Sequence, residues 1–298
     1  MITVIGSINL DLVATVAALP NPGETVPGKA FGTTPGGKGA NQALAVKRAG
    51  AEVHLVGAVG DDPFAEEALA CLREGLVDLS GVRESHATTG TASILVGGDG
   101  ENMIAVVPGA NGTLVPGDVK NAHLEKGDHL LLQHEIPLRT VEAALKEAKA
   151  VGAVSILNTA PFRPEAAAFL HLADYVVANE YEFDAYAKLK GIDGGDREAA
   201  MRRLADETGS TIIVTLGAEG VVAAVQGDML KADGLKIEPV DTVGAGDTFC
   251  GYLAAALGDG LKLEDALRRA AVAGSLACLK PGAQPSIPHA KDVDAALG

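Results

Sequence analysis

The chain has 298 residues, which suits one large domain or one domain with a small appendage, and its formal net charge is −15. A field of that sign repels nucleic acid and anionic lipid, so neither is expected as a partner, whereas small phosphorylated ligands are not excluded. No apolar run reaches about 18 residues and the sequence starts directly on a strand-like segment, so we expect a cytoplasmic protein without a membrane span.

Three widely spaced cysteines, Cys71, Cys250 and Cys278, argue against a disulfide framework or a zinc site. Cys250 and Cys278 lie in apolar helical patterns, which predicts buried thiols. Aromatic residues make up 3% of the chain and Trp is absent, so the core is expected to consist mainly of Ala, Val, Leu and Ile.

The N-terminal part alternates strand and helix signals, and two of its stretches differ from the rest. We expect strands at 2–7 and 53–60 and helices at 38–50 and 63–74. Residues 11–34 and 91–107 instead alternate like half-exposed strands with no helix between them. They predict a small antiparallel sheet that lies over one edge of the main domain as a lid.

From about residue 130 onward, short β-branched runs alternate regularly with amphipathic helices. The predicted strands are 129–133, 153–158, 174–179, 211–217 and 235–240, and the predicted helices are 138–151, 164–172, 179–189, 196–208, 246–257 and 263–279. This alternation is typical of a mainly parallel sheet with helices on both faces. We therefore predict one Rossmann-like α/β domain over residues 1–298, with a small antiparallel β lid.

The segment DTVGAGDTF at 241–249 opens an apolar helix. Gly244, Ala245 and Gly246 leave their amides open to a bound anion, and the helix N-terminus adds unpaired N–H groups. Transfer of a γ-phosphoryl group needs such a site together with a base, and Asp247 stands where the two meet. The alternative is that Asp247 is only an N-cap on a glycine-rich turn.

A second glycine-rich segment, PGGKGANQALA at 35–45, also opens a helix. Its spacing is not that of a Walker A motif. Lys38 is placed to neutralise a phosphate and Asn41 to hydrogen-bond hydroxyl groups, with Gly36, Gly37 and Gly39 as a second anion nest. A plain glycine turn before an amphipathic helix is the alternative.

Other polar residues follow predicted strands, at the edge where α/β sheets bind their ligands. Asn9 and Asp11 follow the first strand two residues apart, so on an extended segment they face the same side, which suits vicinal hydroxyls. Glu135 follows the strand at 129–133. An ordinary turn is the competing account of the first pair.

Two further strand ends carry polar residues. Asn179 and Glu182 lie three apart at a helix start, where a capping box is the alternative to a ligand role. Thr215 and Gly217 follow another buried strand and are placed either to approach phosphate or ribose, or to form a hairpin turn.

Taken together and in order, GSINLD, PGGKGANQA, LLQHEIP, NEYEF, TLGAEG and DTVGAGDTF resemble the ribokinase (PfkB) family of carbohydrate kinases, over about residues 2–288. The resemblance implies a ribokinase-like fold, ATP as phosphoryl donor, Mg²⁺ and K⁺ as cofactors, and a homodimer formed through the β lids. It also implies that the acceptor is a sugar with a primary hydroxyl, with ribose favoured by the GGKGAN and QHEIP details.

The resemblance assigns roles residue by residue. Asp247 would take the proton from the O5 hydroxyl of ribose, and the amides of Gly244, Ala245 and Gly246 would bind the γ-phosphoryl group. The sugar would contact Asn9, Asp11, Gly37, Lys38, Asn41 and Glu135. ATP with Mg²⁺ would lie along Asn179, Glu182, Thr215, Gly217, Gly246 and Ala271, with Glu182 acting through water. The K⁺ positions would be Asp241, Val243, Ala277, Lys280, Gly282 and Ser286, several of them through backbone carbonyls.

Two positions depart from the family pattern. Relatives often carry a polar residue where this chain has Ala271, and Lys280–Pro281 replaces the usual basic pair before GAQPS. Neither change touches the proposed base. The rival functions are another kinase of the family, acting on deoxyribose, fructose or a nucleoside, and a non-catalytic sugar- or nucleotide-binding relative.

Overall fold

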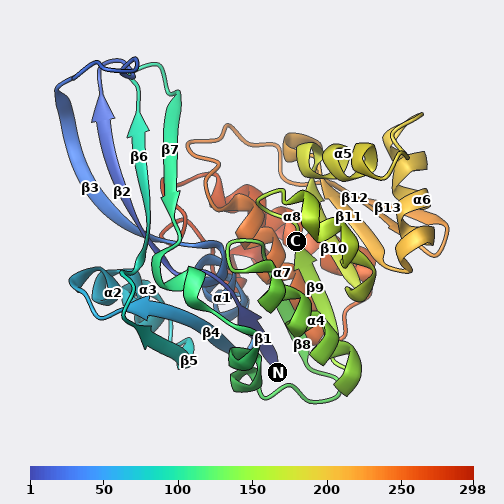
Figure 1. Cartoon of the computed structure of the whole chain (residues 1–298). Coiled ribbons are helices and arrows are strands. Elements are labelled where there is room, and N and C mark those ends of the chain that lie inside the picture. Colours follow the sequence, from blue (N-terminus) through green and yellow to red (C-terminus); the bar gives the residue numbers. More distant parts are fainter.

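A nine-stranded sheet forms the centre of the molecule in the computed structural model, which describes residues 1–298 (Figure 1). The strands lie in the order β13 (Asp228–Ala232), β12 (Val221–Val225), β11 (Thr211–Thr215), β10 (Tyr175–Asn179), β9 (Val154–Asn158), β8 (His129–Leu132), β1 (Ile2–Ile5), β4 (Val53–Gly60) and β5 (Asp78–Ser85). All pairings from β11 to β5 are parallel, and β12 and β13 add an antiparallel hairpin. The prediction of a mainly parallel sheet is confirmed.

The strand order reverses at β1. The chain continues from β1 to β4 and β5 on one side, and then returns to place β8 on the other side of β1. The carboxyl ends of β1 and β8 therefore lie at the point where the strand order reverses, and open α/β sheets bind their ligands at such a point.

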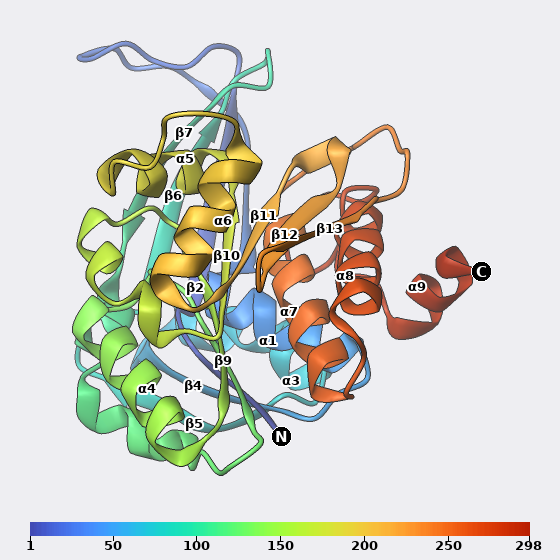
Figure 2. The ribbon, with the colours of Figure 1, turned by 90° about the vertical axis from the view of Figure 1, so that its right-hand side faces the viewer.

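Helices cover both faces of the sheet, as predicted (Figure 2). One face carries α1 (Lys38–Arg48), α3 (Ala70–Glu74), α7 (Ala245–Gly258), α8 (Leu263–Ala277) and α9 (Ala290–Leu297), with α2 (Pro63–Ala68) beside α3; the other carries α4 (Leu138–Val151), α5 (Glu180–Leu189) and α6 (Arg197–Thr208). Successive strand residues divide between two cores: Val4 packs with the first group and Ile5 with the second. No helix is both long enough and apolar enough to span a bilayer.

Four further strands form a separate sheet that projects from the body (Figure 1). Its order is β3 (Gly28–Gly36), β2 (Asn9–Val16), β6 (Gly90–Val96) and β7 (Asn102–Val107). Both hairpins are antiparallel, but β2 and β6 pair in parallel. The reason is that β2 follows β1 and β6 follows β5, so both leave the same edge of a parallel sheet in the same direction. We call this four-stranded sheet the lid.

Several details differ from the sequence predictions. Residues 235–240 form no strand, because the Leu235 amide donates to Ser275 Oγ of α8 at 3.0 Å and Pro239 has no amide to donate. Cys278 is only half-buried, since it follows the last turn of α8. The helix expected at 164–172 is two 3₁₀ turns, and α9 was not predicted. The 3₁₀ segments are Gly109–Thr113, Pro116–Ala122, Pro164–Ala168, Leu170–Leu172 and Gly217–Glu219.

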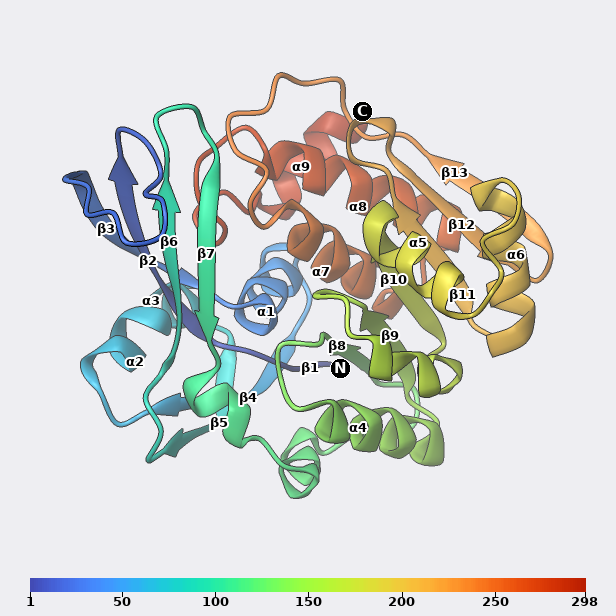
Figure 3. The ribbon, with the colours of Figure 1, turned by 45° about the horizontal axis from the view of Figure 1, so that its top comes forward.

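Close packing of α1 against α7 brings together two helices that lie far apart in the sequence (Figure 3). Gly251 of α7 lies against α1 so tightly that a Cβ there would stand 2.5 Å from Ala45 Cβ and 2.7 Å from the Gln42 carbonyl oxygen. A backbone carbonyl cannot move aside like the end of a side chain, so this position requires glycine.

We predict that Gly251→Ala lowers the free energy of unfolding by about 1–3 kcal/mol, because the added methyl group overpacks the α1–α7 contact although alanine favours a helix. Urea denaturation of the purified protein measures it. Gly258→Ala, in the same helix, is the matched control, since its Cβ would come no closer than 3.3 Å to another atom, the Cδ1 end of the Ile2 side chain. Equal stability of the Gly251 variant and the parent would contradict the packing argument.

Candidate active site

Asp247 lies in the first turn of α7 but does not cap it. The N-cap is Gly244, in the left-handed region at φ 77°, where a Cβ would stand 2.9 Å from Ala283 Cα. The Asp247 carboxylate is buried and accepts two hydrogen bonds from α1: Asn41 Nδ2 donates to Oδ2 and Gln42 Nε2 donates to Oδ1, each at 2.9 Å. The N-cap alternative is therefore wrong.

The glycines before α1 allow this segment to lie directly on β1 and the start of β2. Gly37 has φ 87°, and a Cβ there would stand 2.7 Å from the Asn9 amide nitrogen. A Cβ on Gly39 would stand 2.5 Å from the Gly6 carbonyl carbon. Neither Gly37 nor Gly39 can be replaced by a residue with a side chain without a clash. These glycines therefore let the PGGKG segment pack closely and bring the start of α1 to the sheet edge.

The amides at the start of α7 are partly free. Gly244, Gly246 and Asp247 donate no backbone hydrogen bond within the protein, whereas the Ala245 amide donates to the Thr242 carbonyl at 3.3 Å. A Cβ on Gly246 would meet no atom within 4 Å, so the space over this turn is open. Free amides at the N-terminus of a helix form an anion-binding site.

The polar residues predicted for the sugar lie around the same point. Glu135, which follows β8, accepts through Oε2 from the Lys38 amide at 3.0 Å and from Ser7 Oγ at 2.5 Å. Asn9 Oδ1 accepts from Asn111 Nδ2 at 2.7 Å, whereas the Asp11 carboxylate accepts no hydrogen bond within the protein. Asp11, Lys38, Glu135 and Asp247 form one charged cluster, which we call the basin, because the charges of Glu135 and Asp247 act on both Asp11 and Lys38.

Charge in this basin is dominated by carboxylates. Burial raises the pKa of Asp11 to about 6, and the nearby charges of Glu135 and Asp247 add to this while Lys38 opposes it. The pKa of Lys38 is raised in turn, first by Asp247 and then by Glu135, against the effect of burial. The lysine is therefore held as a cation by the neighbouring carboxylates of Asp247 and Glu135.

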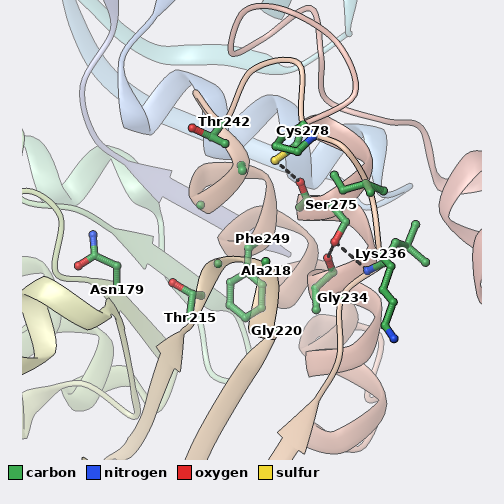
Figure 4. Close-up of a pocket in the computed structure, with 18 of the residues that line it drawn as sticks. Asn179, Thr215, Ala218, Gly220, Gly234, Lys236, Thr242, Phe249, Ser275 and Cys278 are labelled. Atoms are coloured by element: carbon green, nitrogen blue, oxygen red, sulfur yellow. Dashed lines mark hydrogen bonds between the residues drawn. The ribbon is translucent and has the colours of Figure 1, made fainter. Parts of the chain in front are cut away.

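A large cleft opens beside the start of α7 (Figure 4). Its volume is about 1090 Å³, and it is bounded by the strand ends that carry Asn179 and Thr215 on one side and by Phe249 and residues 234–239 on the other. Five of the residues predicted to bind ATP line this cleft: Asn179, Thr215, Gly217, Gly246 and Ala271.

Glu182 does not line this cleft. It forms a capping box with Asn179: Asn179 Oδ1 accepts from the Glu182 amide at 2.8 Å, and Glu182 Oε2 accepts from the Asn179 amide at 3.1 Å. The capping alternative is thus present in the structure. Only Oε2 of Glu182 accepts hydrogen bonds within the protein, the second from Thr159 Oγ1 at 3.3 Å, so Oε1 stays available to water.

The segments predicted for K⁺ also meet. Asp241 Oδ1 accepts from the Val243 amide at 3.0 Å and Oδ2 accepts from the Gly282 amide at 2.8 Å, so its carboxylate joins the loop before α7 to the loop after α8. Oxygen atoms are the donors that hard cations prefer, which these loops offer as carboxylate, carbonyl and hydroxyl. No group of three or more His, Cys, Asp or Glu side chains is placed to hold a metal ion.

The sequence predictions missed several buried polar residues at the site. These are Ser7, Gln42, Asn111, Gln133 and Asn158. Gln133 and Asn158 stand at the ends of β8 and β9, where the same strand-end reasoning that selected Glu135 would have found them. Gln42 directly follows Asn41 in the glycine-rich segment, and nothing in its spacing distinguishes it from a surface glutamine.

Known proteins are similar to this chain in both sequence and fold. The family model described as pfkB family carbohydrate kinase matches residues 1–290. A ribokinase of Bacillus subtilis is 38% identical, with 99% of each chain covered, and a ribokinase of Lactococcus lactis is 37% identical over 99% of this chain and 96% of its own. The structure of Arabidopsis thaliana ribokinase complexed with ribose and ATP matches at a TM-score of 0.88 and 32% identity, covering 99% of this chain and 98% of that one. The chain belongs to the pfkB family of carbohydrate kinases.

Proposed function

We propose that the chain transfers the γ-phosphoryl group of ATP to the 5-hydroxyl of D-ribose and so forms ribose 5-phosphate. The observation that carries this proposal is the position of Asp247. Its carboxylate belongs to the same charged cluster as Asp11, Lys38 and Glu135, and the residue directly follows Gly246, which has a free amide and lines the 1090 Å³ cleft. The similarity to ribokinases over nearly the whole chain supports ribose as the acceptor.

In this mechanism Asp247 accepts the proton of the sugar hydroxyl as the oxygen attacks phosphorus. The amides of Gly244 and Gly246 receive the negative charge of the transferred group, joined by Ala245 if its weak bond to Thr242 opens. The sugar is held by Asn9, Asp11, Gly37, Lys38, Asn41 and Glu135. Asn41 Oδ1 supports this role, because it is buried without a partner and so offers an acceptor to a sugar hydroxyl.

The nucleotide would occupy the cleft along Asn179, Thr215, Gly217, Gly246 and Ala271. Mg²⁺ bound with the nucleotide would supply positive charge against the negative charge that develops during transfer. Because no acidic cluster holds a metal directly, the ion would be bound mainly by phosphate and water, and Glu182 Oε1 is the carboxylate oxygen that suits a contact through water.

A monovalent cation, K⁺, would be bound between the two loops that Asp241 joins. The groups proposed to hold it belong to Asp241, Val243, Ala277, Lys280, Gly282 and Ser286. Its charge would support the neighbouring anion-binding turn, since Gly244 packs directly against Ala283 of the second loop.

The lid supports a further part of the proposal: one domain over residues 1–298 that dimerises through its lids. Large apolar side chains on the lid are exposed, among them Phe31 at 70% and Ile104 at 55%. Exposed apolar groups gathered on one projecting sheet are typical of a surface that binds a partner, and a second copy of the chain supplies the same surface.

We predict that the purified chain releases ADP fastest with ribose among ribose, 2-deoxyribose, fructose and adenosine, and that Asp247→Asn lowers this rate by about 10²–10⁴-fold, because an amide cannot accept the proton. A coupled assay of ADP release measures both. ADP binding by Asp247→Asn, followed by calorimetry, is the control and should stay near that of the parent. Turnover near the parental level in this variant, or a faster rate with another acceptor, would contradict the assignment.

We predict that Asp11→Asn raises the free energy of unfolding at pH 7.5 while it weakens sugar binding. The folded-state pKa of about 6 exceeds the ordinary 3.8, so the stability that Asp11 contributes is present below about pH 4 and is lost as pH rises through 6. Asp11→Asn has no carboxyl group at this position and does not lose this stability. The difference in free energy of unfolding between the variant and the parent should therefore grow between these pH values to the order of 1 kcal/mol.

Urea denaturation at pH 4.5, 5.5, 6.5 and 7.5 checks this, together with the KM for the sugar. Asp61→Asn is the matched control, because Asp61 is exposed and its carboxylate makes no hydrogen bond within the protein. An advantage of Asp11→Asn that does not change with pH would show that burial of the charged form is not its cause.

We predict that replacing K⁺ by tetramethylammonium at constant ionic strength lowers kcat several-fold, because the cation would no longer support the turn before α7. Initial rates of ADP release over a K⁺ titration measure the effect. Equal rates in K⁺, Na⁺ and tetramethylammonium would remove the cation site from the proposal without touching the role of Asp247.

A further inference from the structure

Asp247 is held by a chain of buried side-chain amides that reaches from the first turn of α1 to the end of β8. Gln42 Nε2 donates to Asp247 Oδ1 at 2.9 Å, and Gln42 Oε1 accepts from Gln133 Nε2 at 2.6 Å. Gln42 Nε2 also donates to Asn158 Oδ1 at 3.2 Å. Gln42 and Gln133 are both 0% exposed, so no water competes for these bonds.

The donors and acceptors along this series of hydrogen-bonded amides have a fixed order. An ionised carboxylate only accepts hydrogen bonds, so Gln42 must turn its NH₂ group to Asp247, and its Oε1 must then face a donor. Gln133 supplies that donor. Reversing either amide would place two donors or two acceptors against each other at hydrogen-bond distance in a dry site. The ionised carboxylate and the orientations of both glutamines therefore require one another.

The two oxygens of Asp247 consequently differ. A proton on Oδ1 would face the NH₂ group of Gln42, which is itself a donor that Gln133 and Asn158 hold in place. Oδ2 accepts from Asn41 Nδ2, and Asn41 is less constrained because its own Oδ1 has no partner. A proton on Oδ2 is therefore tolerated, whereas a proton on Oδ1 is opposed.

We propose that Gln42 is a positioning residue: together with Gln133 it keeps Oδ1 of Asp247 as an acceptor and leaves Oδ2 as the atom that takes the proton from the sugar. This rests on the proposed function, in which Asp247 is the base. The sugar O–H bond breaks and its proton goes to Oδ2, while the sugar oxygen keeps the electron pair and bonds to phosphorus. The bond from phosphorus to the β–γ bridging oxygen breaks, and ADP keeps that pair.

Two variants of Gln42 test the proposal, in an assay of kcat and KM with ribose and ATP from pH 5 to 9. Gln42→Leu removes the donor to Oδ1, and kcat should fall about 10- to 100-fold, as expected for the loss of a hydrogen bond to a charged group, with KM for ribose changed less than about threefold. Removing a bond to the ionised form also raises the pKa of the base, so the acid limb of the kcat profile should move to higher pH.

Gln42→Glu separates the hydrogen-bond effect from an effect of altered packing, because it keeps the size of the side chain and the acceptor for Gln133. It places a second carboxylate against Oδ1, the two groups must share a proton, and the acid limb should again move to higher pH. Thr3→Val is the matched control: Thr3 of β1 is equally buried and its hydroxyl has no partner, so kcat and the acid limb should stay at the parental values.

A double-variant cycle tests whether Gln133 acts on Asp247 through Gln42. Gln133→Leu should lower kcat less than Gln42→Leu, and the double variant should be no slower than Gln42→Leu, because Gln133 acts only through Gln42. If the losses of kcat in the two single variants add in the double variant, Gln133 does not act through Gln42. An unchanged acid limb in both Gln42 variants, or a rise in KM at constant kcat, would overturn the positioning role. These failures differ from that of the proposed function, which fails if Asp247→Asn turns over normally.

Discussion

The contact between the N-terminal ends of α1 and α7 is the interaction on which the site depends. Two adjacent amides of α1 donate to the buried carboxylate of Asp247, which lies 206 and 205 residues further along the chain. Burying a carboxylate is costly unless hydrogen bonds compensate it, and bonds to an ionised acceptor are the strong ones. The carboxylate therefore stabilises the contact between the two helices only where both amides are present. Placing the proposed base thus depends on the folding of the whole domain.

Glycines make this contact geometrically feasible. Gly37 and Gly39 bring the start of α1 onto the backbone of the first strands, and Gly251 lets α7 approach the same helix at a distance that no Cβ allows. Gly244 does the same for the turn before α7 against Ala283. The residues proposed to bind and react thus lie close together because glycines at these contacts lack side chains.

Strand-end reasoning from the sequence selected many of the residues that the structure gathers at the candidate site. Because carboxyl ends of parallel strands meet at one edge, Asn9, Glu135 and Thr215 were expected near each other before any contact was known. Gln42 was not found, since its partners lie on a strand and a helix far along the chain. The segment 235–240 has a strand-like pattern, but its Leu235 amide donates to Ser275 Oγ of α8 and its Val240 amide donates to the carbonyl of Cys278, which follows α8. Neither contact leaves a local signal.

The groups left without partners indicate what completes the site. Asp11 carries a carboxylate that burial and two neighbouring charges oppose, and Asn41 carries a buried oxygen with no donor. Such groups reduce the stability of the unliganded protein, and each accepts a hydrogen bond. A polyhydroxyl ligand would supply several donors at once and would relieve both costs, whereas an anionic acceptor would add to the repulsion among the carboxylates. The same arrangement that weakens the empty basin therefore favours a neutral sugar as its occupant, and binding that sugar should stabilise the fold.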